Sequence, residues 1–190
     1  MPPGGSTREE AGAAALTLRG HAVTLRPLER RHLERTRGWA NDPALMRLLG
    51  RERTVSEAEH EEWFERVVRG REDCAYFAVE TNDEGAHVGN VWLWEIDRRH
   101  RRAELRVVVG EPGHTGRGEG TEAISLLCEY AFGLLGLHRV YAYVLAFNPR
   151  ARRSFEKAGF ALEGTLREDR RAGEGYTDVF VLGRLARQEE

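Results

Sequence analysis

A glycine-rich segment, Gly110–Gly120, runs directly into the most strongly patterned helix of the sequence, which we expect from Thr121 to about Gly136. The apolar residues of that helix recur with a period of 3.6, so that one face of it packs on a core. Glycines let a backbone approach a ligand closely, and the first N–H groups of a helix favour an anion. The junction therefore predicts a phosphate or pyrophosphate seated over Arg117–Thr121, with Arg117 adding a charged contact.

The common phosphate-loop patterns do not fit this segment. A P-loop needs a lysine after its last glycine, and the segment contains no lysine. A dinucleotide fingerprint needs a Gly-x-Gly-x-x-Gly spacing and an acidic residue at the end of the next strand. The glycines here run Gly116-x-Gly118-x-Gly120, and the next expected strand ends in Phe147-Asn148. A connector that binds nothing stays open as the alternative, and His114 within it reads as an exposed loop histidine or as a contact to substrate or phosphate.

The remaining pattern predicts a mixed α/β domain. Strands are expected at Ala22–Leu25, Ala75–Glu80, His87–Ile96, Ala103–Val109, His138–Phe147 and Tyr176–Leu182, with a further extended segment from Gly159 and helices over 29–40, 44–49, a stretch after Ser56, and Asn148–Lys157. No repeat or change of composition divides the chain, so residues 19–190 are expected to form a single domain. Residues 1–18 lack periodicity and are expected to be a disordered tail.

Two of these strands place polar or aromatic side chains together by their alternation. Ala103, Leu105 and Val107 share one face, and Glu104 and Arg106 share the other. Trp92 and Trp94 likewise share one face of their strand, and one of them can line a substrate cleft.

The charge balance excludes some classes of partner. The sequence has 29 basic and 31 acidic residues, for a formal net charge of −2, which argues against a general binder of nucleic acid or of a membrane surface. No apolar run approaches the roughly 18 residues that a membrane span needs. Cys74 and Cys128 alone make no metal framework. A cytoplasmic protein without a metal is the expectation.

Four ordered motifs, spread over residues 22–186, resemble one known family. They are Thr24-Leu25-Arg26-Pro27-Leu28, Trp39-x-Asn41-Asp42-Pro43, Thr115-Gly116-Arg117-Gly118-Glu119-Gly120, and the run from Asn148 through Phe155-Glu156-Lys157-Ala158-Gly159-Phe160, with Glu163-Gly164-x-x-Arg167 and Asp178 also fitting. The chain resembles the GNAT superfamily of N-acetyltransferases, and within it the ribosomal-protein-alanine acetyltransferase-like group. Thr115 departs from the family's usual Gln or Arg.

The resemblance implies a fold and a set of contacts to acetyl-CoA. The fold is a central, mixed but mostly antiparallel twisted sheet of six or seven strands with flanking helices, which splays open between Ala103–Val109 and His138–Phe147. The implied coenzyme A contacts are Val107, Val108, Val109, Thr115, Gly116, Arg117, Gly118, Glu119, Gly120, Thr121, Asn148, Arg150, Arg153 and Phe155.

The resemblance also implies a catalytic arrangement. Glu104 is the expected general base for the attacking amine, and a structural ion pair with Arg106 or Arg102 is the alternative. Phe155 stands where many members of the family carry a tyrosine that protonates the departing thiolate. That role falls to Ser154 or to Tyr176, or to no side chain at all.

The function implied is direct transfer of an acetyl group from acetyl-CoA to a primary amine in a ternary complex. The acceptor is a protein N-terminus or a small-molecule amine, no nucleic acid or membrane partner is expected, and a homodimer is possible. Two alternatives stay open, namely a GNAT-like sensor that binds acyl-CoA without turnover and an unrelated nucleotide-binding regulatory protein.

Overall fold

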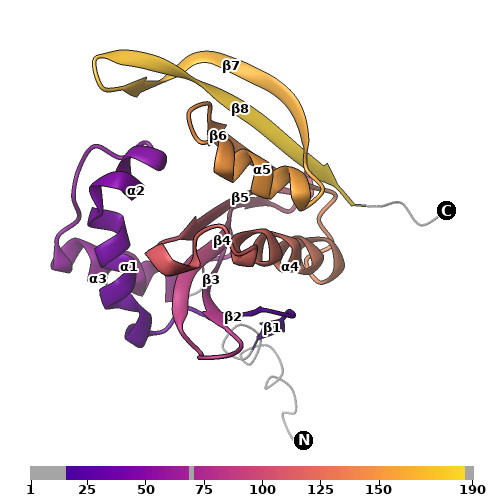
Figure 1. Cartoon of the computed structure of the whole chain (residues 1–190). Coiled ribbons are helices and arrows are strands. Elements are labelled where there is room, and N and C mark those ends of the chain that lie inside the picture. Colours follow the sequence, from indigo (N-terminus) through magenta and orange to yellow (C-terminus); the bar gives the residue numbers. More distant parts are fainter. Residues whose placement is uncertain (1–15, 69–70, 187–190) are drawn as a thin grey trace, which may run out of the picture.

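One sheet organises the chain (Figure 1). In the computed structural model, which describes residues 16–68 and 71–186, its strands are β1 (Leu18–Arg19), β2 (Val23–Pro27), β3 (Cys74–Thr81), β4 (His87–Asp97), β5 (Arg102–Val109), β6 (Arg139–Leu145), β7 (Ala161–Ala172) and β8 (Gly175–Leu185). The helices are α1 (Leu33–Asn41), α2 (Pro43–Leu48), α3 (Glu57–Val68), α4 (Glu119–Gly133) and α5 (Pro149–Lys157).

The strand order is β1-β2-β3-β4-β5-β6-β8-β7. Every neighbouring pair is antiparallel except β5 and β6, which are parallel. The expected mixed, mostly antiparallel sheet is confirmed. It has eight strands within the described residues rather than six or seven, because β1 adds a short edge strand. Pairing thus begins at Leu18, four residues before the first expected strand, and Leu16 and Leu18 pack against the core. Most of the expected tail, residues 1–15, lies outside the described residues.

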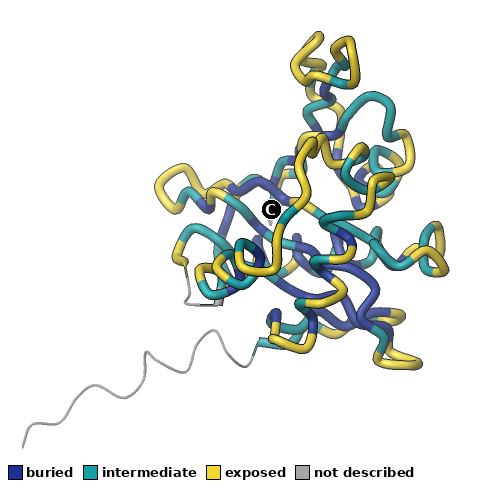
Figure 2. The backbone as a smooth tube through the Cα atoms, turned by 90° about the vertical axis from the view of Figure 1, so that its left-hand side faces the viewer, coloured by how far each residue is buried: buried dark blue, intermediate teal, exposed yellow. Residues whose placement is uncertain are grey.

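The two faces of the sheet carry different helices (Figure 1). Val91 and Leu93 of β4 pack with Leu127 of α4 in the main core. On the opposite face, Ala78 of β3 packs with Phe64 of α3 in a smaller cluster. Figure 2 shows the buried residues gathered in the interior of the molecule, with exposed residues along its outlying segments. The alternation of side chains along β3 and β4 therefore directs one set toward α4 and the other set toward the face on which α1 and α3 lie.

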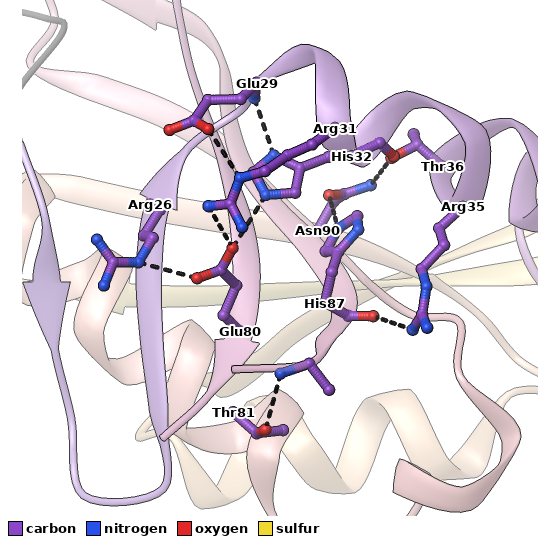
Figure 3. Close-up of polar contacts among 11 residues, drawn as sticks. Arg26, Glu29, Arg31, His32, Arg35, Thr36, Glu80, Thr81, His87 and Asn90 are labelled. Carbon is purple, nitrogen blue, oxygen red and sulfur yellow. Dashed lines mark hydrogen bonds and ion pairs between the residues drawn. The ribbon is translucent and has the colours of Figure 1, made fainter. Parts of the chain in front are cut away.

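A polar network fastens α1 to that face (Figure 3). The buried His32 accepts a hydrogen bond from the Glu29 N–H at Nδ1, 2.8 Å away, and its Nε2 donates to Glu80 at 3.0 Å. Arg26 and Arg31 also pair with the carboxylate of Glu80, at 2.9 and 2.7 Å. Both Glu80 oxygens thus have partners, as a buried carboxylate requires.

A second part of the network holds the middle of α1. The Asn90 amide donates to the Thr36 hydroxyl at 3.1 Å and accepts from His87 Nε2 at 3.0 Å. The His87 ring lies between those of His32 and Trp39, with centroids 4.6 and 4.7 Å away. Burial lowers the pKa of His87 to about 4 and also lowers the pKa of His32, so both imidazoles are neutral near pH 7.

The segment after α1 is held by the motif residues themselves. The Asn41 side chain donates to the carbonyl of Val55 and accepts from its N–H, at 2.9 and 2.7 Å. Asp42 caps α2 by accepting from the Leu45 N–H at 2.9 Å, with Pro43 in the first turn. These contacts hold α2 between α1 and the segment that leads to α3.

The strands β5 and β6 diverge shortly after they meet. Their pairing covers Arg102 with Arg139, Ala103 with Val140, and Glu104 with Tyr141, and no later pair is formed. Beyond Glu104, β5 continues to Val109, and β6 continues to Leu145. The expected splay is confirmed, and it opens at Glu104.

Candidate functional site

A cavity of about 370 Å³ lies where β5 has left β6. It is lined by the end of β5, the glycine-rich segment, the start of α5, and residues of and just after α2: Val107, Val108, Val109, His114, Thr115, Gly116, Gly118, Gly120, Thr121, Asn148, Arg150, Ala151, Arg153, Ser154, Lys157, Leu45, Leu48 and Leu49. The structure thus brings together most of the coenzyme A contacts expected from the sequence. Arg117 and Glu119 do not line this cavity.

The loop geometry explains the glycines. Gly116 and Gly118 have φ of 86° and 95°, a backbone conformation that residues with a Cβ rarely adopt. Gly118 is the N-cap of α4, so the helix begins at Glu119, two residues earlier than expected. The first N–H groups of a helix have no partner within it and favour an anion. Gly118, Gly120 and Thr121 at this helix start line the cavity, and the anion site expected there stays a prediction.

His114 and Glu119 pair beside this loop. Nδ1 of His114 lies 2.9 Å from a carboxylate oxygen of Glu119, and both side chains are largely buried. The expectation of an exposed His114 is therefore wrong, because the carboxylate at the first turn of α4 draws the imidazole inward. Glu119 contributes its backbone to the helix start, while its side chain is turned to His114.

The α5 side of the cavity carries positive charge. Asn148 caps α5 by accepting from the Ala151 N–H at 3.1 Å, so the N-cap interpretation of this residue is confirmed while it also lines the cavity. Arg150, Arg153 and Lys157 line it as well. Phe155 is buried, with its ring 5.0 Å from that of Phe160.

A second cavity, of about 270 Å³, continues along β5 toward the splay. It is lined by Glu104, Arg106, Trp92, Phe155 and Tyr143, among others. Glu104 is 5% exposed, and its carboxylate accepts two hydrogen bonds from Arg106, at 2.7 and 2.9 Å. This contact raises the pKa of Arg106. The ion pair expected as the alternative is present, and it holds the carboxylate against the cavity.

The hydroxyl groups expected to serve as a general acid lie in different places. Ser154 lines the first cavity. Tyr176 lies near the turn of the β7–β8 hairpin, 68% exposed, and lines none of the cavities formed by the described residues. The sequence reasoning missed Tyr143, a phenol on β6 that lines the second cavity beside Glu104. Its position depends on where β6 leaves β5, which no local pattern of the sequence shows.

A third cavity, of about 490 Å³, lies between α1, α3 and the outer face of β3–β5. Trp92 and Trp94 both line it, as their shared face predicts, together with Trp63 and Tyr76. Only one of the arginines around it, Arg106, was singled out from the sequence. The others come from α3 and the loop before it, where no local pattern reveals a site.

Three further observations concern a metal site, a membrane span and a free thiol. Over residues 16–68 and 71–186, no cluster of His, Cys, Asp and Glu has the composition to hold a metal ion. In the same residues no helix combines the length and apolar character that crossing a membrane demands. Cys128 is fully buried, and burial raises the pKa of its thiol to about 12.

Comparison with known proteins agrees with this geometry. The family model described as "Acetyltransferase (GNAT) domain" matches residues 22–161. The spermidine N(1)-acetyltransferase of Escherichia coli (strain K12) is 34% identical over 146 residues, which cover 77% of this chain and 76% of that protein.

Solved structures give the same result. The spermidine N-acetyltransferase from Vibrio cholerae, in complex with CoA and spermine, is 32% identical with a TM-score of 0.80, covering 86% of this chain and 95% of that one. A dodecameric structure of that enzyme has a TM-score of 0.73, also at 32% identity, covering 86% of this chain and 94% of that one. The names of these relatives mention no protein N-terminus as a substrate. The likeness to the ribosomal-protein-alanine group therefore stays a prediction.

The splayed sheet, the glycine-rich loop at the start of α4 and the match over residues 22–161 agree with one another. The enzyme moves an acetyl group from acetyl-CoA to a primary amine, and the chain belongs to the GNAT family of acetyltransferases.

Proposed function

We propose that acetyl-CoA lies along the first two cavities, with its pyrophosphate at the start of α4 and its acetyl group beside Glu104. The observation that carries this is the divergence of β5 and β6 directly after the Glu104–Tyr141 pair. It leaves Val107–Val109 without a β6 partner, so their edge is available to the pantetheine arm. The N–H groups of residues 117–121 then meet the pyrophosphate, and Arg150, Arg153 and Lys157 supply positive charge to the phosphates.

Glu104 is the general base in this proposal. The amine nitrogen forms a bond to the acetyl carbonyl carbon, the carbon–sulfur bond breaks, and the amine loses a proton to Glu104 directly or through a water molecule. Arg106 is a positioning residue, because its two hydrogen bonds fix the orientation of the carboxylate. A base that is held in one orientation accelerates proton transfer more than a freely moving base of the same pKa.

The departing thiolate takes a proton from Ser154, from Tyr143 or from water. Ser154 lines the cavity assigned to the coenzyme, and Tyr143 lines the one that contains Glu104. Phe155 has no proton to give and forms part of the wall at this point. Tyr176 is exposed and lines neither of these cavities, so it is not proposed as the proton donor within one copy of the chain.

The acceptor in this proposal is a small-molecule amine, since the relatives that match most of the chain are named as spermidine acetyltransferases. The matching dodecamer supports a homo-oligomer. Residues 19–186 act as one domain, because β1 to β8 belong to one sheet.

A thermal melt tests the donor site. At a concentration of about 100 times Kd, a ligand of the native state adds roughly 2.7 kcal/mol, which raises Tm by about 5 to 10 °C. Acetyl-CoA and coenzyme A should produce this shift, and NAD should not. A shift with NAD alone, or with none of the three, contradicts the assignment.

A further inference from the structure

The third cavity is continuous with the proposed reaction site. It shares Leu49, Arg51, Trp92 and Arg106 with the second cavity, which contains Glu104. It shares Leu49 and Val108 with the first. A molecule in the third cavity can therefore extend past Trp92 and Arg106 toward Glu104. The walls of this cavity are then the walls of the acceptor site.

Aromatic side chains form one wall. The rings of Tyr76 and Trp92 stack with centroids 4.8 Å apart and an interplanar angle of 17°, and Trp63 meets Tyr76 edge-on at 5.1 Å. Trp63 belongs to α3, and the other two rings and Trp94 stand on the face of the central sheet that α3 covers; all four are only half buried. Their exposed parts give a cavity of about 490 Å³ an apolar wall that fits a flat apolar group.

The charged side chains around the cavity are unequal in number. Four arginines line it, at positions 51, 53, 66 and 106, against two glutamates, at positions 59 and 62. Arg53 pairs with Glu59 at 2.6 Å, Arg66 lies 3.5 Å from Glu62, and Arg106 is engaged by Glu104. Burial, followed by the charges of Arg37 and Arg51, lowers the pKa of His60, so this lining imidazole adds no positive charge near pH 7.

Arg51 is the remaining one of the four lining arginines. No hydrogen bond or ion pair to its side chain is formed within the described residues, and it borders both the aromatic cavity and the one that contains Glu104. An unpaired guanidinium at this junction is suited to a carboxylate, which it can bind with two parallel hydrogen bonds.

We propose that the acceptor is an aromatic primary amine that carries a carboxylate, with its ring on the Trp63–Tyr76–Trp92 wall and its carboxylate on Arg51. This deepens the proposed function and rests on the placement of acetyl-CoA and Glu104 given above. The amine nitrogen bonds to the acetyl carbon, the thioester carbon–sulfur bond breaks, the amine proton leaves through Glu104, and the thiolate takes up a proton. The carboxylate of the acceptor is unchanged.

The same charges disfavour a polyamine. Aromatic faces also attract ammonium groups, but a cation in this cavity meets an excess of arginines. One face of Trp94 is already taken by the guanidinium of Arg71, 5.1 Å from the ring centroid. A polycation therefore loses more to repulsion here than it gains from the rings.

Release of coenzyme A tests the proposal, with tryptophan, tryptamine and spermidine as acceptors. Tryptophan and tryptamine differ only in the carboxylate, so we expect tryptophan to have a kcat/KM about tenfold higher, the worth of one good charged contact. Spermidine should be the poorest of the three. Arg51→Gln should remove the advantage of tryptophan over tryptamine, so that the ratio of their kcat/KM values falls to about one. Arg53→Gln is the matched control, since Arg53 is already paired with Glu59, and it should leave the preference in place.

The possible failures are distinguishable. A higher kcat/KM for spermidine than for tryptophan overturns the acceptor class while the acetyl transfer stands. Equal values for tryptophan and tryptamine, or a preference that survives Arg51→Gln, overturn the role of Arg51. If no amine releases coenzyme A while acetyl-CoA still raises Tm, the acceptor class is wrong and the donor site holds. If acetyl-CoA also leaves Tm unchanged, the proposed donor site itself has failed.

Discussion

The carboxylate of Glu104 and the guanidinium of Arg106, two residues apart on β5, meet through two hydrogen bonds of 2.7 and 2.9 Å. The pair lies at the point where β5 leaves β6, with the carboxylate buried and the guanidinium half exposed. The acid is thereby held in one orientation beside the proposed acetyl position.

Glu104→Gln should lower kcat by about 100-fold or more, because the amide cannot take the proton of the amine. The Tm shift with coenzyme A should be retained. Arg106→Gln keeps the carboxylate and removes its orientation, so kcat should fall by less, about tenfold. Steady-state thiol release measures both, and full activity in Glu104→Gln would rule out this base.

Gly118→Ala should destabilise the fold and weaken coenzyme binding together. Its φ of 95° strains any residue with a Cβ by about 1 to 2 kcal/mol, a loss of roughly 2 to 8 °C in Tm. Gly113→Ala is the control, because that glycine has open space around its Cβ position and no left-handed φ. Equal melting curves and equal coenzyme titrations for the two variants would contradict the proposed role of the loop.

Lys157 gives a direct readout of the donor site. It is the only lysine in the sequence, it is exposed, and it lines the first cavity. Coenzyme A should therefore slow its labelling by an amine-reactive acetyl ester several-fold, measured on the peptide by mass spectrometry. NAD at the same concentration is the control. Labelling at the same rate with and without coenzyme A would place the ligand elsewhere.

Acidification should weaken the attachment of α1. The pKa of His87 is about 4 in the fold against an ordinary value of 6.5, so the unfolded chain binds more protons between these values. The stability is complete above about pH 6.5 and falls as the pH drops toward 4, by about 2 kcal/mol at pH 5 for this one group. Tm should then fall by about 4 to 8 °C.

His87→Gln separates this effect from other acid effects. Glutamine keeps a donor for Asn90 and removes the titration. The variant should lose less Tm between pH 7 and pH 5 than the parent does, as followed by circular dichroism. An identical loss in both would assign the acid sensitivity to other groups.

Ser154→Ala and Tyr143→Phe compare the two candidate proton donors. The variant that removes the donor should lower kcat with little change in KM for the amine, because the proton reaches the thiolate only as it departs. Both hydroxyls lie at cavity surfaces, so neither change empties a core position. Unchanged kcat in both variants, and in the double variant, would leave water as the donor.

The sequence predicted the parts of the fold that depend on local pattern. The glycines before α4, the alternation along β4 and β5, and the cap at Asn148 are each local, and each was placed correctly. The splay after Glu104 was also expected, but through the family resemblance and not through the pattern of residues.

Most of the contacts that the sequence did not reveal join distant segments. The exception is His114, which is drawn inward by Glu119, five residues further along the chain. Tyr143 reaches the site because β6 pairs with β5 for only three residues. Arg51, Arg53 and Arg66 of the third cavity come from α3 and the loop before it. In the sequence, charged residues of this kind look like an ordinary solvent-exposed surface. Such pairings depend on topology, which no short window contains.

The parallel junction of β5 and β6 has a mechanical consequence. One antiparallel run of strands ends at β5, another begins at β6, and three residue pairs join them. In the proposed position, a donor molecule contacts β5 on one side and α5 on the other, and so adds a link between two sets of strands that otherwise join through these pairs and the core under α4. We expect the loaded enzyme to be stiffer than the empty one, so that donor binding also rigidifies the catalytic strand.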